Sequence, residues 1–250
     1  MTQSVWDIAV QQNKSKPAQG NVETTIIFAG NRQSGKSTII NRFLEKDETP
    51  KPTLALDYTF GRKGTRAVSH IWELGGGSKL SDLIDVLITP NNILLVVITS
   101  LNLHLILVVD LSNRLRQKNV THIQNTLNEN LRKRISSTHP DVELLNPFPL
   151  PLTFLGTKYD IFRQQNLISK TIRFLSHYYG ASLYFTSIRE DELLKKTRIL
   201  LNHIAFGGKI TFNEQMKTGK PLAIPVSMDS FSNIGNYYCL FELRMFSHGF

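Results

Sequence analysis

Runs of apolar and β-branched residues alternate along the chain with segments whose apolar residues recur every three or four positions. The first pattern is typical of buried strands and the second of amphipathic helices. The runs predict six strands, at residues 24–29, 54–62, 67–74, 105–110, 152–156 and 182–186. The second and third lie on either side of Gly61-Arg62-Lys63-Gly64, which predicts a hairpin.

Helical spacing of apolar residues fills the intervals between these runs. It predicts helices at residues 37–44, 80–87, 123–135, 168–175 and 193–204, the last ending near Gly207 and Gly208. Continuous apolar strands separated by amphipathic helices predict an α/β fold, with a mostly parallel sheet covered by helices on both faces. Ligands of such sheets bind beyond the carboxyl ends of the strands.

One apolar stretch, at residues 93–109, resembles a membrane span but is too short, since a span needs about 20 residues. Polar residues also interrupt it, at Thr99, Ser100, Asn102 and His104. We therefore interpret it as two buried segments and expect no membrane insertion. We expect His104 to be an edge or core histidine, because no second His or Cys lies at metal-ligand spacing from it.

Length and composition predict one large domain with extensions at both ends. The chain has 250 residues, of which 41% are apolar and 20% charged. We expect a flexible N-terminal extension at 1–20, in which Trp6 and Ile8 could dock as an anchor, a main α/β domain at 21–208 and a C-terminal extension at 209–250. The polar start predicts no secretory signal. A single cysteine, Cys239, excludes an intramolecular disulfide framework and fits a reducing compartment.

The net charge of +9 is spread over many predicted elements. Nucleic acid, an acidic protein surface or an anionic nucleotide would each suit this charge. The densest basic run, Arg132-Lys133-Arg134, lies on the outer face of the helix predicted at 123–135, where we expect it to be solvated.

The chain's most informative motif is a phosphate-binding loop, G-x-x-x-x-G-K-[ST], which lies between a predicted strand and a predicted helix. Glycines at its ends permit backbone angles that turn successive N–H groups toward an anion. The lysine would reach the β and γ phosphates, and the serine hydroxyl would bind Mg²⁺. The predicted nucleotide-binding residues of this region are Gly30, Asn31, Arg32, Gln33, Ser34, Gly35, Lys36, Ser37 and Thr38.

Two further segments resemble the switches of small GTPases. Residues 53–58 resemble the first switch of Rab-like proteins, in which the residue corresponding to Thr53 senses the γ-phosphate and Mg²⁺. Residues Glu73-Leu74-Gly75-Gly76 resemble the second switch, D-x-x-G, with Glu in place of Asp. The resemblance implies Ser37 and Thr53 as Mg²⁺ ligands and Gly76 as a nucleotide-binding residue.

The base-reading motif N-K-x-D of GTPases has a counterpart in Thr157-Lys158-Tyr159-Asp160, with Thr in place of Asn. Asp160 would accept hydrogen bonds from guanine, Lys158 would cover the base, and Thr186-Ser187 stands where a further segment supports it. These motifs follow one another in the GTPase order, each at a strand end, and together they predict a Ras-like P-loop NTPase fold.

Three departures weaken the predicted hydrolytic site. Gly77 occupies the position of the Gln that orients the attacking water, so we expect no useful turnover and no enzyme. Thr157 removes a hydrogen bond to the base, and Glu73 alters the Mg²⁺ shell. These changes indicate GDP or GTP with Mg²⁺ held as a structural ligand, or no nucleotide at all.

Longer blocks resemble one family specifically. Residues 50–58, 72–77, 146–149 with 156–160, and 177–183 look like the corresponding segments of the dynein light intermediate chains, most closely the dynein 2 branch. The resemblance runs from about Trp6 to Gly235. It implies a non-catalytic motor subunit that binds and stabilises the dynein 2 heavy chain, alongside other dynein 2 subunits, and contacts microtubules indirectly.

The same resemblance implies a role in retrograde intraflagellar transport and cilium assembly, and a location in the cytoplasm, cytoskeleton, cilium and basal body. It implies no nucleic-acid partner. Residues 237–246 depart from the family pattern, so we expect the C-terminal extension to be truncated relative to the family through splicing or a gene-model error; a short docking segment is the alternative. A Rab-like regulatory GTPase stays open as a second function, although Gly77, Thr157 and the lack of a C-terminal prenylation cysteine oppose it.

Overall fold

A computed structural model of the chain describes residues 22–76, 102–110, 138–148, 150–162, 166–217 and 220–235. Several predictions lie outside these residues: the helices at 80–87 and 123–135 with Arg132, the water-positioning site at Gly77, the N-terminal extension, and the C-terminal residues that include Cys239.

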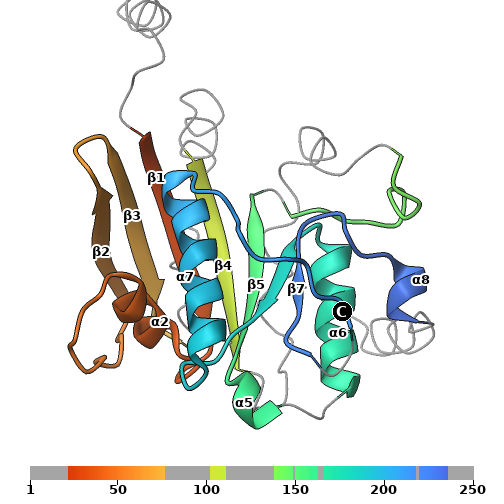
Figure 1. The fold of residues 1–250 in the computed structure, drawn as a ribbon, viewed down its shortest axis with the longest axis horizontal. Helices are drawn as coiled ribbons and strands as arrows, with labels where there is room; N and C mark the ends of the chain where they lie inside the picture. The colour runs from red at the N-terminus through yellow and green to blue at the C-terminus, as the bar shows by residue number, and fades with distance from the viewer. Residues whose placement is uncertain are drawn as a thin grey trace, which may run out of the picture.

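The described residues form seven strands and five helices in an α/β arrangement (Figure 1). The strands are β1 (Val22–Gly30), β2 (Leu56–Lys63), β3 (Ala67–Leu74), β4 (Asn102–Asp110), β5 (Leu152–Thr157), β6 (Ser182–Phe185) and β7 (Ala223–Ile224). The helices are α2 (Lys36–Phe43), α5 (Tyr159–Phe162), α6 (Asn166–Tyr178), α7 (Asp191–Phe206) and α8 (Phe231–Ile234). All six predicted strands are confirmed, as are the three predicted helices that fall within the described residues.

The strands form one sheet in the order β2-β3-β1-β4-β5-β6-β7. The five central strands pair in parallel, in the order β3, β1, β4, β5, β6. The edge strands β2 and β7 pair antiparallel with β3 and β6. The prediction of a mostly parallel sheet is therefore confirmed, and so is the hairpin of β2 and β3.

Helices cover the sheet on both faces, as predicted. Side chains alternate along β1, so that Ile26 and Phe28 face one apolar cluster while Ile27 and Ala29 face another. Helices α2 and α7 pack on the first cluster, with α7 in front of the sheet in Figure 1, and α6 packs on the second through Ile172.

Local signals explain where α7 begins and ends. Its first turn carries Asp191 and Glu192, which complement the positive end of the helix dipole. It ends at Gly207, whose φ of 67° is the left-handed conformation that commonly closes a helix. The predicted end at Gly207 is confirmed.

The segment after α7 adds parts that the sequence pattern did not predict. Strand β7 pairs with β6, so the sheet includes residues beyond the domain boundary expected at residue 208. Helix α8 packs through Phe231 and Ile234 against Phe174 of α6. His104 lies within β4, where its Nε2 is 2.9 Å from the Thr153 hydroxyl of β5, a position that agrees with the expected core histidine.

Candidate nucleotide site

The phosphate-binding loop connects β1 to α2, as predicted. Gly30 has a φ of 148° and Gly35 a φ of 94°, angles that favour glycine. A Cβ on Gly30 would also lie only 2.1 Å from the carbonyl oxygen of Val108 in β4. The loop therefore requires glycine at Gly30 for two separate reasons, its backbone angle and its close approach to the neighbouring strand.

Lys36 lies across this loop. Its Nζ donates to the carbonyl oxygens of Gly30 at 3.1 Å and Asn31 at 2.9 Å. Only 4% of the residue is exposed, and burial lowers the pKa of its ammonium group, with Glu73 opposing the shift. The loop thus holds a buried cation with an incomplete counter-charge, an arrangement that attracts an anion.

The hydroxyl expected to bind Mg²⁺ is engaged by a carboxylate. Ser37 Oγ donates to Glu73 Oε1 at 2.7 Å, which joins the start of α2 to the end of β3. Neighbouring ligands of an octahedral Mg²⁺ lie about 3 Å apart, so these two oxygens fit one Mg²⁺ with little movement. Thr53 lies in the loop before β2, and within the described residues no hydrogen bond joins it to Ser37 or Glu73.

The glycines that follow β3 pack directly against the loop. A Cβ on Gly76 would lie 2.1 Å from the backbone nitrogen of Arg32, and the Arg32 Nε donates to the Gly76 carbonyl at 3.0 Å. The amide of Gly75 in turn donates to the carbonyl of Ala55 at 2.6 Å. The second switch-like segment is therefore held against the loop by the protein's own groups.

Thr157 connects the base-reading segment to the same loop. Its hydroxyl donates to the carbonyl oxygen of Ser34 at 2.7 Å, and the residue is 4% exposed. The hydroxyl of Ser34 is fully buried and has no hydrogen-bond partner among the described residues. Such a group costs about 1–3 kcal/mol, so the shape of the loop is not optimised for stability alone.

Asp160 already has two protein partners. It accepts a hydrogen bond from Ser187 Oγ at 2.6 Å and forms an ion pair with Arg189 at 3.3 Å. The Arg189 side chain is 74% exposed and can move away, whereas Ser187 is buried. The preceding residue, Lys158, has a φ of 58°. Sequence reasoning placed Ser187 beside the base but missed Arg189.

The structure thus brings most of the predicted site residues together at the carboxyl ends of the parallel strands. Contacts join the loop from Gly30 to Ser37 with Gly76 and Thr157, and Asp160 follows on α5. Asn31 and Gln33 lie in the loop and Thr38 in α2. Thr53 lies apart from this group in sequence, in the loop before β2, and no hydrogen bond among the described residues joins it to Ser37 or Glu73.

No protein-family model matches the chain. Its similarity to individual proteins is extensive, however. The chain is 38% identical to cytoplasmic dynein 2 light intermediate chain 1 of Danio rerio over an alignment 275 positions long, which covers 93% of this chain and 75% of the relative. The Homo sapiens relative of the same name is 36% identical and is covered to 76%. The chain belongs to the cytoplasmic dynein 2 light intermediate chain family.

Solved structures agree with this family and with the predicted fold. The crystal structure of the conserved domain of a dynein light intermediate chain superposes with a TM-score of 0.53 at 15% identity, covering 92% of this chain and 87% of that one. The small GTPase Arl6 of Trypanosoma brucei, solved with the analogue GppNp, gives a TM-score of 0.50 at 20% identity, covering 75% and 99%. The Ras-like P-loop fold is confirmed.

In this member of the family, contacts of Arg32, Glu73 and Thr157 hold the phosphate loop. Among the described residues, no helix has both the length and the apolar character needed to span a membrane.

Proposed function

We propose that this light intermediate chain is a non-catalytic subunit of the cytoplasmic dynein 2 motor. It binds and stabilises the dynein 2 heavy chain, contacts other subunits of the complex, and reaches microtubules through the heavy chain. Its role is retrograde intraflagellar transport and cilium assembly, in the cytoplasm, the cilium and the basal body. The observation that carries the proposal is the similarity to dynein 2 light intermediate chains over 93% of the chain.

The contacts of the loop support a structural role rather than a switching one. A regulatory GTPase moves its switch segments when the γ-phosphate is lost. Here Arg32 and Gly76 join the loop to the second switch-like segment, and Ser37 does the same through Glu73. A nucleotide would therefore add stability to an arrangement that the side chains already favour.

The residues present fit a bound GDP or GTP with Mg²⁺. The N–H groups of the loop and Lys36 would hold the phosphates, Ser37 and Glu73 would hold the metal, and Asp160 would face the base after Arg189 moves aside. The metal would neutralise phosphate charge. We propose that this nucleotide, where present, stabilises the domain and that its hydrolysis drives nothing.

Co-purification tests the proposal. The full chain carrying an affinity tag is expressed in ciliated cells, and its partners are identified by mass spectrometry. A dynein heavy chain should be recovered equally with wild type and with Lys36→Ala, and purified protein should show no measurable GTP turnover. Recovery of partners only with GTP-loaded protein, without a heavy chain, would instead support the Rab-like switch.

Nucleotide content is measured on the same material. Purified protein is denatured and the released nucleotide is separated by chromatography, with Lys36→Ala as the control. Stoichiometric GDP or GTP that is lost in Lys36→Ala would establish a working phosphate site. If the purified protein contains no nucleotide and Lys36→Ala is as stable as the wild type, the function lies in protein contacts alone.

A further inference from the structure

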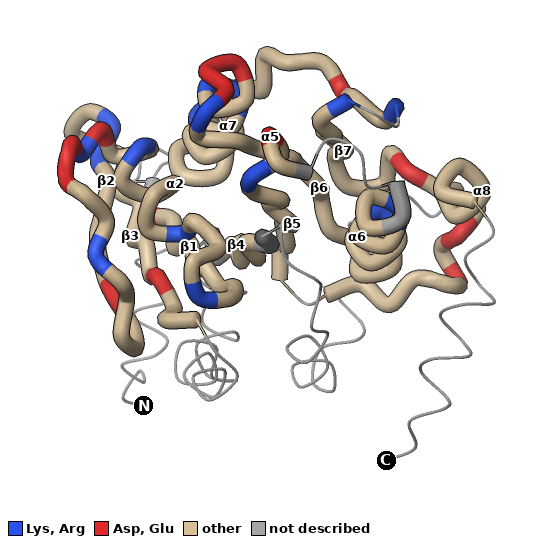
Figure 2. Tube along the Cα trace, turned by 90° about the horizontal axis from the view of Figure 1, so that it is seen from below, with Lys and Arg blue, Asp and Glu red and all other residues tan. Residues whose placement is uncertain are grey.

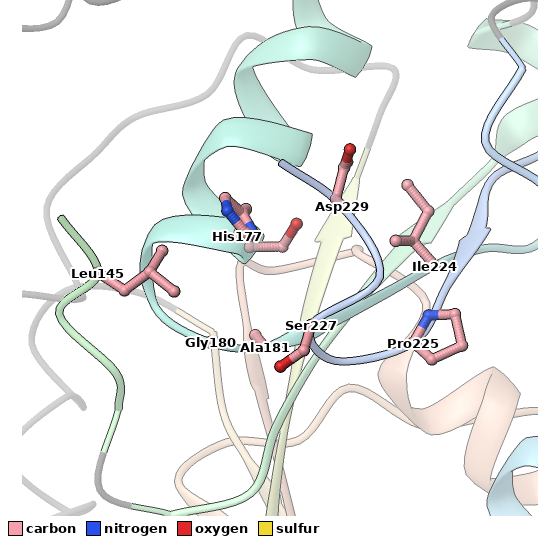
Figure 3. A pocket seen from close by; sticks show the side chains of 9 residues that line it. Leu145, His177, Gly180, Ala181, Ile224, Pro225, Ser227 and Asp229 are labelled. Carbon is pink, nitrogen blue, oxygen red and sulfur yellow. The ribbon is translucent and has the colours of Figure 1, made fainter. Parts of the chain in front are cut away.

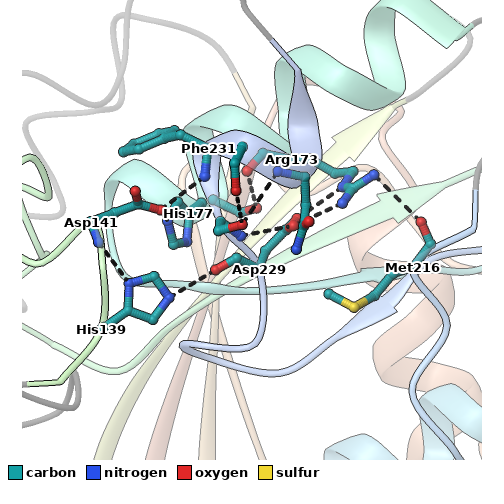
Figure 4. A network of polar contacts seen from close by, with 11 residues as sticks. His139, Asp141, Arg173, His177, Met216, Asp229 and Phe231 are labelled. Atoms are coloured by element: carbon teal, nitrogen blue, oxygen red, sulfur yellow. Dashed lines mark hydrogen bonds and ion pairs between the residues drawn. The ribbon is translucent and has the colours of Figure 1, made fainter.

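A polar network far from the nucleotide site joins three segments of the chain (Figure 4). The segments are the loop at residues 138–148, helix α6, and the C-terminal segment at 225–235. We call the network the clasp, and its side chains are those of His139, Asp141, Arg173, His177 and Asp229. None of them is used by the site described above.

The ring of His139 is fixed in one tautomer. The backbone N–H of Asp141 donates to His139 Nδ1 at 3.1 Å, so this nitrogen must carry a free lone pair. The proton is then on Nε2, which donates to the carbonyl oxygen of Asp229 at 2.9 Å. A protonated ring would present N–H to N–H at Nδ1, so this contact requires neutral His139.

His177 and Asp141 form the second part of the clasp. His177 Nε2 donates to Asp141 Oδ2 at 2.9 Å, and the same oxygen accepts the backbone N–H of Phe231 at 2.9 Å. Burial lowers the pKa of His177, with Asp141 and Asp229 opposing the shift and His139 adding to it. The rings of His139 and His177 are 5.2 Å apart, so two imidazolium charges would repel each other.

Arg173 supplies a contact that does not depend on the histidines. Its guanidinium donates to both carboxylate oxygens of Asp229, at 2.9 and 2.8 Å, and to the carbonyl of Met216 at 3.4 Å. The charged and titratable groups around His177 are therefore Asp141 and His139 from the loop, Arg173 from its own helix, and Asp229 from the C-terminal segment.

We propose that the clasp is proton-sensitive and releases the C-terminal segment when its histidines are protonated. Two polar contacts of this segment pass through the cluster: His139 to the Asp229 carbonyl, and Asp141 to the Phe231 amide. Protonation of His139 breaks the bond that orients Asp141, and a second charge on His177 adds repulsion. The ion pair of Arg173 with Asp229 and the apolar contacts of α8 do not depend on the histidines and remain.

A small hollow lies beside the clasp. His177, Ser227 and Asp229 are among the residues that line this hollow, which has room for about one water molecule (Figure 3). The buried hydroxyl of Ser227 has no hydrogen-bond partner among the described residues, so a water molecule is its natural partner. Such a water would lie within the same hollow as His177.

A metal ion is the competing occupant of the cluster. Ligand atoms of His139, Asp141 and His177 lie within 4.8 Å of one another. However, both nitrogens of His139 and the Nε2 of His177 already serve in hydrogen bonds with protein groups. A metal bound through these nitrogens of both rings would displace at least two of these bonds, whereas protonation of His139 Nδ1 breaks one, so the contacts favour protons.

Hydrogen exchange of the full chain, measured by mass spectrometry at pH 7.5 and 5.5 and corrected for the intrinsic rate, tests the proposal. Protection of residues 225–235 should fall by about tenfold or more at the lower pH, because hydrogen bonds that hold this segment are lost when the clasp opens. Protection of β1 should stay unchanged. The double variant His139→Asn/His177→Gln keeps an acceptor at position 139 and a donor at position 177. Neither new side chain titrates, so the variant should lose the pH dependence. The control His70→Asn replaces a histidine of β3, outside the clasp, and should retain the pH dependence.

Three results would overturn the proposal. The first is equal protection of residues 225–235 at both pH values, and the second is the same loss of protection at pH 5.5 in the double variant as in the wild type. The third is one zinc ion per purified chain that the double substitution removes. If the double variant does not fold, NMR titration of the histidine ring protons in the wild type replaces it. The two clasp histidines must then titrate over the same pH range in which residues 225–235 lose protection, and titration outside that range would contradict the clasp.

Discussion

Ser37 donates a hydrogen bond of 2.7 Å to the carboxylate of Glu73, and so connects the helix after the phosphate loop with the strand that leads to the second switch-like segment. A glutamate reaches one methylene further than the aspartate usual at this position. The longer side chain lets the carboxylate contact the serine directly, and it also lies near the ammonium group of Lys36. One residue therefore provides both a hydrogen bond and counter-charge.

Glu73→Ala should lower the free energy of unfolding by about 1–3 kcal/mol, since it leaves the Ser37 hydroxyl without its acceptor and removes counter-charge from buried Lys36. Urea denaturation at pH 7.5 measures the change. Glu45→Ala is the matched control, because the Glu45 side chain is 77% exposed and its ion pair with Arg198 lies at the surface, so its loss should cost less than about 1 kcal/mol. Equal effects of the two substitutions would contradict the role given to Glu73.

Gly30→Ala should cost about 2–4 kcal/mol, because the new Cβ meets the Val108 carbonyl and the backbone angle of 148° resists any side chain. Gly208→Ala is the control. Its Cβ would lie 3.5 Å from the nearest atom outside its two neighbours in the chain, and its backbone angle is ordinary. Thermal unfolding of the two variants should differ clearly, and similar melting temperatures would show that the loop can rearrange.

Arg173→Met should destabilise the domain by about 3–5 kcal/mol, since it leaves the buried carboxylate of Asp229 without its cation. Both side chains of this pair are nearly buried, at 7% and 5% exposure. Arg189→Met breaks an ion pair at the surface, where the arginine is 74% exposed, and should change stability by less than about 1 kcal/mol. Denaturant unfolding compares the two, and the double variant Arg173→Met/Asp229→Leu should recover part of the loss.

Tyr184 should make stability fall at alkaline pH. Burial raises the pKa of its phenol to about 12, with a smaller contribution from Glu214. Below pH 10 the phenol is protonated in both the folded and the unfolded chain; above it the unfolded chain ionises first, so stability is lost as the pH rises toward 12. Between pH 10 and 11 the loss should be about 1 kcal/mol. Tyr184→Phe should remove this part, whereas Tyr58→Phe, at a tyrosine 44% exposed, should not.

The regular part of the fold could be predicted because its signals are local. Strand β1 and helix α7 carry long apolar patterns, and Gly207 ends its helix where the pattern stops. Strand β7 has two residues, too few to show any alternation, and its pairing with β6 depends on residues about 40 positions earlier. A short edge strand of this kind is decided by tertiary contacts, which sequence periodicity does not report.

The candidate site was predictable as a set of residue types but not as a set of contacts. The motif positions from Gly30 to Ser37 could be found because the loop needs particular residues at fixed spacing. The bond from Arg32 to Gly76 joins residues 44 positions apart, and nothing in either local segment indicates it. Arg189 was missed for a similar reason, since an exposed arginine after a strand is ordinary until Asp160 is found beside it.

The hydrogen bond from Thr24 to the carbonyl of Ala205 at 2.7 Å spans 181 residues and sets an order of events during synthesis. Strand β1 leaves the ribosome first, yet it lies at the centre of the sheet between two strands made later. At about 5–20 residues per second, roughly 10–40 s pass between the emergence of Thr24 and that of Ala205. Throughout this interval the apolar face of β1 has no helix α7 to cover it. Until helix α7 is complete, this exposed apolar face makes the nascent chain prone to aggregation.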